Sequence, residues 1–230
     1  MKVYAISDLH LSLSGEKPMD IFGEKWEGYL EKISSDWNER VNDDDVVLIA
    51  GDISWAMSLE NALKDVDYLN SLKGTKIIIR GNHDYWWQGI TKIRSSLPKN
   101  VIALQNDSVK IGNYIFCGSR GWAVEGSPDF DEHDRHIYER ECERFKLALA
   151  SSEKLRVEGD VLVCLIHYPP FNVRKENSLF TELFEKYKVD KVVYGHLHGK
   201  GVNVYPRLNK NGVEYILTSC DLVDNKLVEV

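Results

Sequence analysis

Five short runs dominated by apolar residues constrain the fold of this chain more than any other feature of its sequence. The runs read VYAI, VVLIA, KIII, LVCLI and KVVY. A strand with one face in water alternates apolar and polar residues, whereas a strand covered on both faces lacks that alternation. We therefore expect a layered α/β sandwich, in which helices cover the outside and two layers of strands lie within.

Segments with helical spacing of apolar residues separate most of these runs. Helices are predicted at residues 26–41, 58–73, 131–155 and 178–188, and between the third run and Pro98. Residues 101–119 instead read as short strands with a turn at Gly112 and Asn113, which is typical of a meander. The segments EYILTSC and KLVEV are predicted to form a closing strand pair.

The size and composition of the chain favour one domain. It has 230 residues, 43% of them hydrophobic, which is enough to bury one sizeable core. The sequence contains no internal repeat, low-complexity segment or linker. We expect a single domain over residues 1–230.

The charge and the cysteines exclude several classes of protein. A net charge of −7 disfavours a long nucleic-acid groove, although a short substrate held by metal ions would not need one, so nucleic acid is not excluded. The sequence lacks a signal-peptide pattern and a run of membrane-spanning length, so we expect a cytoplasmic protein without a membrane partner. The four cysteines form no CxxC pair and are expected to be reduced thiols in the core.

Each apolar run ends in side chains that commonly bind metal ions. They are Asp8, His10, Asp52, Asn82, His167, His196 and His198. Ligand sites in α/β sheets lie beyond the carboxyl ends of the strands, so these side chains are expected to converge. Their carboxylate, amide and imidazole groups suit Mn, Fe, Zn or Ni better than an all-oxygen Mg or Ca site. Manganese is the ion we expect to support activity in vitro.

Seven ligands are more than one ion needs, and a single closed structural zinc site fits them poorly. If Asp52 bridges two divalent transition-metal ions, each ion has four protein ligands. The expected sets are Asp8, His10, Asp52 and His198 for one ion, and Asp52, Asn82, His167 and His196 for the other. Two ions roughly 3.5–4 Å apart can share a hydroxide nucleophile and stabilise an in-line displacement at phosphorus. This predicts a hydrolase of phosphomonoesters or phosphodiesters, acting on a small phosphorylated substrate.

The segment RGNHDYWW adds catalytic candidates next to a predicted ligand. His83 follows Asn82 and is expected to face the leaving group, where it would donate a proton or stabilise negative charge. Asp84 is expected to hold the His83 ring in the required tautomer. Arg80 is a candidate for binding non-bridging phosphate oxygens, and a surface ion pair is the alternative.

These residues resemble the calcineurin-like metallophosphoesterase superfamily, whose sequence blocks occur here in order. The blocks are DLH, GD, GNHD, the lone histidine of IHYPP, and GHLH, and they span residues 8–198. The resemblance implies a four-layer αββα sandwich of two mixed β-sheets flanked by helices. It also implies the binuclear metal assignment above and the acid role of His83.

The sequence departs from many members of that superfamily after the GD block. Where those members carry Asp, Asn or His, this chain reads GDISWAM, which leaves the subfamily open. GNHD also speaks against the lipid-A-pathway hydrolases, which resemble GNRD. A binding module that keeps the fold without the chemistry, as in the related retromer subunit, is the alternative function. His83 argues against it, because that non-catalytic relative lacks this histidine.

Three further side chains are candidates for substrate contacts. Trp55 lies just after a predicted strand end and could stack on a base, sugar or aromatic leaving group. Arg120 and Arg135 lie in the segment SRGWAVEGSPDFDEHDRH, where a loop could cover the substrate. For Trp86 and Trp87 we expect core packing. One of the pair could face the cleft, because adjacent residues of a helix point to different faces.

Overall fold

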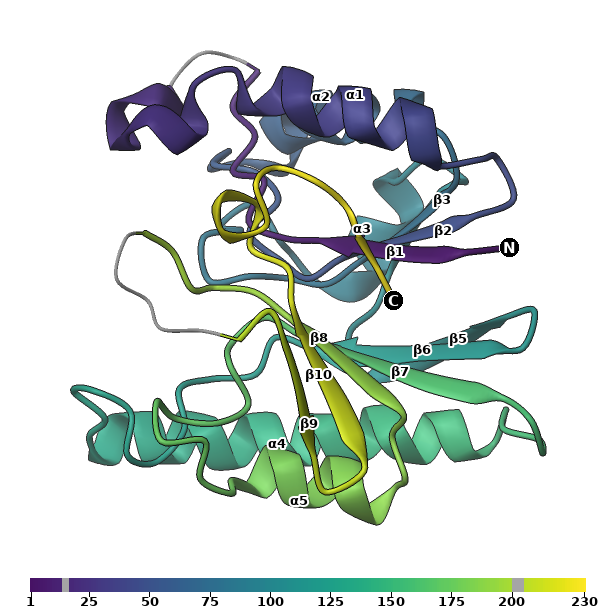
Figure 1. Ribbon diagram of the computed structural model, residues 1–230, viewed down its shortest axis with the longest axis vertical. Coiled ribbons are helices and arrows are strands. Elements are labelled where there is room, and N and C mark those ends of the chain that lie inside the picture. Colours follow the sequence, from purple (N-terminus) through teal and green to yellow (C-terminus); the bar gives the residue numbers. More distant parts are fainter. Residues whose placement is uncertain (14–16, 200–204) are drawn as a thin grey trace.

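Two mixed β-sheets pack against each other between two layers of helices in the computed structural model (Figure 1). The structure describes residues 1–13, 17–199 and 205–230. Figure 1 shows α1 and α2 covering the outer face of one sheet, and α4 and α5 covering the outer face of the other. This is the expected αββα sandwich of two mixed sheets.

The first sheet has five strands and contains the first three apolar runs. Its order is β11 (Val228–Glu229), β1 (Val3–Ile6), β2 (Val46–Ile49), β3 (Thr75–Ile78) and β4 (Val101–Ala103). Strands β1 to β4 are parallel, and β11 pairs antiparallel with β1. The carboxyl ends of three neighbouring parallel strands therefore lie at one edge, where the predicted ligands follow them.

The second sheet has six strands. Its order is β5 (Asp107–Ile111), β6 (Tyr114–Ser119), β7 (Val161–Ile166), β8 (Lys191–Tyr194), β10 (Val213–Leu217) and β9 (Arg207–Lys210). The four central strands are parallel, whereas the edge strands β5 and β9 are antiparallel to their neighbours. The last two apolar runs, β7 and β8, are thus central strands, as their lack of alternation requires.

Five α-helices in the described part of the chain complete the outer layers. They are α1 (Tyr29–Arg40), α2 (Leu59–Ser71), α3 (Ile90–Ser96), α4 (Glu132–Glu153) and α5 (Leu179–Lys186), and three short 3-10 helices lie at Met19–Phe22, Glu24–Trp26 and Cys220–Leu222. The long helix α4 begins in a capping box, because Asp131 accepts a hydrogen bond from the Asp134 backbone and Asp134 accepts one from the Asp131 backbone. No helix in the described part of the chain is both long and apolar enough to cross a membrane.

The core consists of three layers that follow the alternation of side chains along the strands. On β1, Val3 and Ala5 pack between the two sheets, whereas Tyr4 and Ile6 pack toward the helices. On β7, Val163 and Leu165 lie between the sheets in the same way. Both faces of these strands are dry, which explains the unbroken apolar runs in the sequence.

Two strand pairings differ from the sequence prediction. The closing segments do not pair with each other: β10 lies between β8 and β9, whereas β11 pairs with β1 in the other sheet. The predicted meander is correct only for the hairpin of β5 and β6, since β4 pairs parallel with β3. Pattern alone could not show that the chain changes sheets after β4 and again after β10.

Candidate metal centre

The candidate metal centre lies where the carboxyl ends of strands from both sheets meet. Asp8, Asp52 and Asn82 follow β1, β2 and β3 of the first sheet, and His167 and His196 follow β7 and β8 of the second. Backbone hydrogen bonds align the loops after β1 and β2, because the Asp8 amide donates to Gly51 and the His10 amide donates to Asp52. Residues far apart in the sequence thus converge at this edge (Figure 1).

Short contacts connect all seven predicted ligands. The Asn82 Oδ1 atom lies 2.7 Å from His167 Nε2 and 2.9 Å from His196 Nδ1. The Asp52 Oδ2 atom lies 3.5 Å from His167 Nε2 and 3.7 Å from His10 Nε2.

Asp8 completes the network, since His198 Nε2 lies 3.2 Å from Asp8 Oδ1 and the His196 amide donates to the same carboxylate. Among the described residues, Asp8 groups with His10 and His198 as a potential ligand cluster, and also with Asp52 and His167. Asp8 therefore lies close to residues of both predicted ligand sets, although the sequence prediction assigned it to only one of them.

Four of these residues have a strained backbone. Asp8, His10, Asp52 and His196 have φ angles of 59°, 45°, 51° and 70°, in the left-handed region that residues with side chains rarely adopt. Such strain persists where the surrounding structure imposes it, and it is often found at functional sites. Here the left-handed backbone at these residues turns side chains from the ends of three strands, β1, β2 and β8, toward one point.

Two glycines allow the carboxylates to approach the neighbouring loops. A Cβ atom on Gly81 would lie 2.1 Å from Asp52 Oδ1, and a Cβ atom on Gly195 would lie 2.3 Å from Asp8 Oδ2. No side chain fits at these distances. The glycines of the GNHD and GHLH blocks are therefore required by the packing of the site itself.

We predict that Gly81→Ala destabilises the protein by roughly 1–3 kcal/mol, because the added methyl group has no room beside Asp52. The measurement is thermal or chemical unfolding together with bound metal. Gly89→Ala is the matched control, since a Cβ atom there meets nothing within 4 Å. Equal stability of the two variants would contradict the packing argument.

Two of the histidines are oriented by hydrogen bonds from the ring nitrogen that faces away from the cluster. His167 Nδ1 lies 2.9 Å from the Ala50 carbonyl oxygen, and His198 Nδ1 lies 2.8 Å from Asp221 Oδ1. Each contact leaves Nε2 directed at a carboxylate or amide oxygen of the cluster. A carboxylate or carbonyl behind a metal-binding histidine fixes its tautomer and raises its basicity.

Sequence reasoning missed Asp221. It is 2% exposed and also accepts a hydrogen bond from the Gly199 amide, so it holds the GHLH loop as well as the His198 ring. A signal was present, because Asp221 follows the apolar segment EYIL in the same way that the predicted ligands follow their runs.

We predict that Asp221→Ala lowers metal affinity by about 10–100-fold, because His198 loses the partner that orients it. Competition with a metal-binding dye measures this change. Asp67→Ala, on the exposed side of α2, is the control and is expected to bind metal as the unchanged protein does. Unaltered affinity in Asp221→Ala would remove the proposed role of this carboxylate.

Burial and the neighbouring carboxylates shift the pKa values of the histidines in opposite directions. Burial alone would lower the pKa of His167, but the Asp52 carboxylate raises it to about 9. Burial would likewise lower the pKa of His198, but its hydrogen bond with Asp221 raises it to about 10. Burial lowers the pKa of His10 to about 4. The negative charge of Asp52 and Asp221 raises the pKa of the neighbouring imidazoles, and the same charge favours a bound cation.

The arrangement fits divalent metal ions. Two ligand atoms on one ion with bonds of about 2.1 Å lie roughly 3.0–3.4 Å apart, close to the separations between His198 and Asp8 and between His167 and Asp52. His10 Nδ1 is a buried polar atom without a hydrogen-bond partner among the described residues. The donor set combines carboxylate, amide and imidazole groups, which suits transition metals.

His83 lies beside this cluster. Its ring centroid is 4.6 Å from that of Trp55 and 5.6 Å from that of His10. Its backbone amide donates to Asp52 Oδ1 over 2.8 Å. Burial lowers the pKa of His83. The ring is partly exposed, so a substrate at the cluster can reach it.

The structure corrects the expected role of Asp84. No hydrogen bond joins Asp84 to His83 in the described part of the chain. Asp84 instead accepts hydrogen bonds from the backbone amides of Ile53, Ser54 and Gly81 and from the Trp86 indole. Burial, followed by the nearby charge of Asp52, raises its pKa to about 6. Asp84 ties the loop after β2 to the loop after β3.

The three residues predicted to contact substrate have different surroundings in the structure. Trp55 stacks on His10 with ring centroids 4.6 Å apart, so it forms part of the wall of the site. Arg120 is partly buried against the Trp122 ring and lies 3.5 Å from Glu141. Arg135 forms ion pairs with Glu125 and Glu132 on the surface, which leaves little charge for a phosphate.

Trp86 and Trp87 lie in the core, as expected, with exposed fractions of 1% and 5%. They belong to a turn rather than a helix, since α3 begins only at Ile90.

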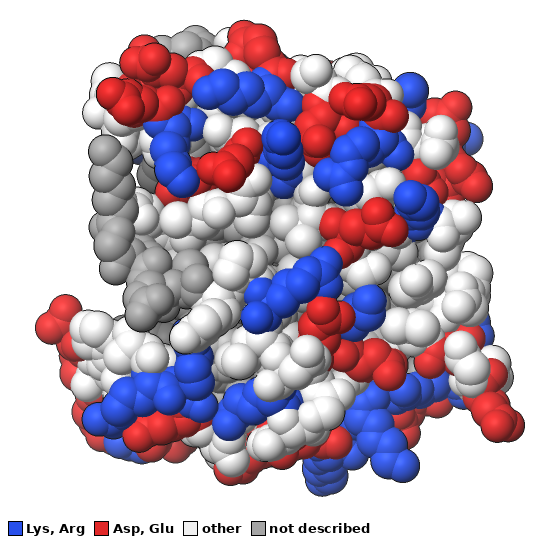
Figure 2. Space-filling view, viewed as in Figure 1, with Lys and Arg blue, Asp and Glu red and all other residues white. Residues whose placement is uncertain are grey.

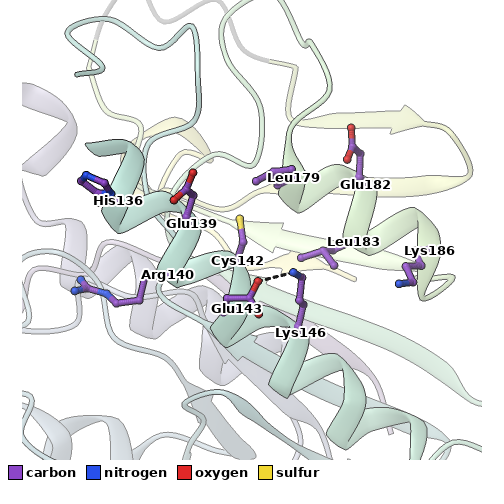
Figure 3. A pocket seen from close by; sticks show the side chains of 10 residues that line it. All are labelled: His136, Glu139, Arg140, Cys142, Glu143, Lys146, Leu179, Glu182, Leu183 and Lys186. Carbon is purple, nitrogen blue, oxygen red and sulfur yellow. Dashed lines mark hydrogen bonds and ion pairs between the residues drawn. The ribbon is translucent and has the colours of Figure 1, made fainter. Parts of the chain in front are cut away.

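A pocket of about 620 Å³ lies elsewhere, between α4 and α5 on the outside of the second sheet (Figure 3). It contains none of the predicted metal ligands. Figure 3 shows Leu179 and Leu183 of α5 facing Cys142 and Lys146 of α4. This pocket is separate from the metal centre.

Comparison with known proteins supports the resemblance seen in the sequence. The family model described as Calcineurin-like phosphoesterase matches residues 1–200. An uncharacterized protein of Methanocaldococcus jannaschii is 25% identical over 197 residues, which cover 84% of this chain and 96% of that protein.

Two solved structures share the fold at low sequence identity. The phosphopantetheinyl hydrolase of Mycobacterium tuberculosis is 15% identical, with a TM-score of 0.59 over 100% of this chain and 95% of that one. TT1561 of Thermus thermophilus is 13% identical, with a TM-score of 0.58 over 99% and 97% of the two chains.

Proposed function

Because the chain belongs to the calcineurin-like phosphoesterase family, we propose that it is a two-metal hydrolase of phosphomonoesters or phosphodiesters. The observation that carries this proposal is the convergence of seven metal-type ligands from both sheets on one site, with Asp52 between His10 and His167. Two divalent ions, when bound there, activate water for attack on phosphorus and offset the negative charge of the transition state.

The surrounding residues have separate tasks in this proposal. Asp8, His10, Asp52 and His198 would hold one ion, and Asp52, Asn82, His167 and His196 would hold the other. His83 faces the leaving group and donates a hydrogen bond or a proton to its oxygen. Asp84 acts as a positioning residue, because it fixes the loops that carry Asp52 and Asn82.

The face of the molecule in Figure 2 agrees better with a small substrate than with a long nucleic acid. Figure 2 shows one face of the molecule on which Lys and Arg side chains lie interspersed with Asp and Glu. A long nucleic acid requires a continuous basic track, because its phosphates supply much of the binding energy. The face in Figure 2 offers no such track over its described part.

The rival function is a binding module that holds metal without catalysis. It predicts no use for His83, whereas this chain places that histidine beside the ligands and leaves its Nδ1 atom without a hydrogen-bond partner among the described residues. A site built only for binding would have no need of such an imidazole. We therefore favour the hydrolase.

The test is hydrolysis of a chromogenic phosphomonoester and of the matching phosphodiester. The protein is stripped with a chelator and reloaded with Mn²⁺, and parallel samples receive Fe²⁺, Zn²⁺ or Ni²⁺. We expect turnover only after reloading, and the ratio of the two substrates assigns the ester class. Bound metal without turnover of either ester would favour the binding module.

A further inference from the structure

A cavity of about 460 Å³ has four arginine side chains in its lining, which makes it unusual in an acidic protein. They come from three parts of the chain: Arg80 follows β3, Arg120 follows β6, and Arg140 and Arg144 lie on α4. We refer to this cavity as the arginine pocket. Its volume is in the range of pockets that bind small molecules.

The arginine pocket borders the candidate metal centre. Arg80 is two residues from Asn82, so their Cα atoms lie within about 8 Å of each other. The Arg120 carbonyl oxygen accepts hydrogen bonds from the backbone amides of His167 and Tyr168, over 3.0 and 3.4 Å. The Tyr168 ring in turn lies 4.2 Å from the His196 ring. One small molecule could therefore reach both sites.

The lining of the pocket carries excess positive charge. Its only acidic residue is Glu141, which is fully buried and lies against Arg120 and Arg144. Four arginines and one glutamate give a formal charge of 4 − 1 = +3, while the whole chain carries −7. The second carboxylate oxygen of Glu141 accepts from Ser119, so this acid has little capacity left for further arginines.

Two of the arginines have N–H donors that no carboxylate of the described residues accepts. Arg80 and Arg140 form no ion pair with any carboxylate in the described ranges, and the Arg80 Nε atom is buried without a hydrogen-bond partner there. Figure 3 shows the Arg140 side chain pointing away from Leu183 and Lys186 of α5. Arg140 lines both the pocket drawn there and the arginine pocket. Clustered guanidinium groups of this kind are stabilised by an anion, and their planar donors match the oxygens of a phosphate group.

We propose that the arginine pocket binds a second phosphate group of the substrate, so that the protein acts on small molecules carrying two phosphate groups. One phosphate group lies at the metal centre, and the other is held by Arg80, Arg140 and Arg144. This inference rests on the hydrolase function proposed above. Water attacks the phosphorus at the metal centre, the bond from phosphorus to the ester oxygen breaks, and that oxygen leaves as an alcohol after it takes a proton.

The test compares monophosphates and bisphosphates of the same diols, from propanediol to hexanediol, as substrates of the Mn²⁺-loaded protein. We expect kcat/KM for the bisphosphate to exceed that for the monophosphate by at least about 10-fold at one chain length, since a hydrogen bond to a charged group contributes that much. In Arg140→Gln/Arg144→Gln, the ratio is expected to fall close to one.

Two further variants keep this test decisive. Arg140→Gln alone changes an exposed residue and is expected to lower the ratio even if the double variant folds poorly. Lys146→Gln alters the charge of the same helix outside the arginine pocket and is expected to keep the ratio. An unchanged ratio in Arg140→Gln and in the double variant would overturn the inference.

The outcomes separate the two proposals. If monophosphates are hydrolysed and no bisphosphate has an advantage, the arginine pocket fails and the hydrolase function stands. If no ester is hydrolysed, titration calorimetry with butanediol bisphosphate decides. Binding that depends on Arg140 and Arg144 would then support the pocket while the hydrolase function fails, and binding that is absent or unaffected by these variants would overturn the pocket as well.

Discussion

Asp52→Asn is expected to lose most of its bound metal and at least about 1,000-fold in kcat/KM. The substitution keeps the size of the side chain but removes the charge that lies between His10 and His167. Because Asp52 is the one residue assigned to both ions, its loss affects the whole cluster. Metal content and ester hydrolysis measured on the same sample test this.

Asp45→Asn is the matched control for this prediction. Asp45 is also buried, but it lies before β2, at the opposite end of the strand from Asp52, and it accepts hydrogen bonds from the amides of Lys2 and Asn42. This variant is expected to lose some stability and to keep both metal and activity. Full metal content in Asp52→Asn would contradict the bridging role.

His83→Ala is expected to lower kcat by about 100–10,000-fold while the metal content stays unchanged. His83 is not among the seven residues proposed to hold the ions, and its ring lies beside Trp55 at the partly exposed side of the cluster. The loss should be larger for a poor leaving group, such as an alkyl alcohol, than for nitrophenol. This dependence on the leaving group separates a role on its oxygen from a structural role.

The control for this variant is His136→Ala. His136 is an exposed histidine near the start of α4, and its removal is expected to leave turnover unaltered. Full turnover by His83→Ala on both kinds of ester would show that His83 has no part in the reaction. Loss of metal in His83→Ala would instead assign it to the ligand set.

The layers and the convergence of the candidate ligands could both be predicted from the sequence, because both follow from the same local pattern. Runs such as VVLIA and LVCLI must be buried on both faces, and the polar residue after each run then lies at the carboxyl edge of a sheet. The contacts that link Asp8, Asp52, Asn82 and the histidines arise from this arrangement.

Other features depend on tertiary contacts that no local pattern encodes. The position of β11 beside β1 requires the chain to return to the first sheet after β10. Asp84 was expected to contact the neighbouring His83, but the amides of another loop surround its carboxylate. The arginine pocket brings together arginines from two loops and from α4, whose proximity is visible only in the fold.

In the proposed function, Asp52 would contribute to both metal ions and so join them into one catalytic site. The most direct test of this role is a titration of the chelator-stripped protein with Mn²⁺, in which bound ions per chain and ester hydrolysis are measured at each step. We predict two bound ions per chain, with activity rising as the second ion binds. Full activity with one ion, or a chain that binds only one, would contradict this role.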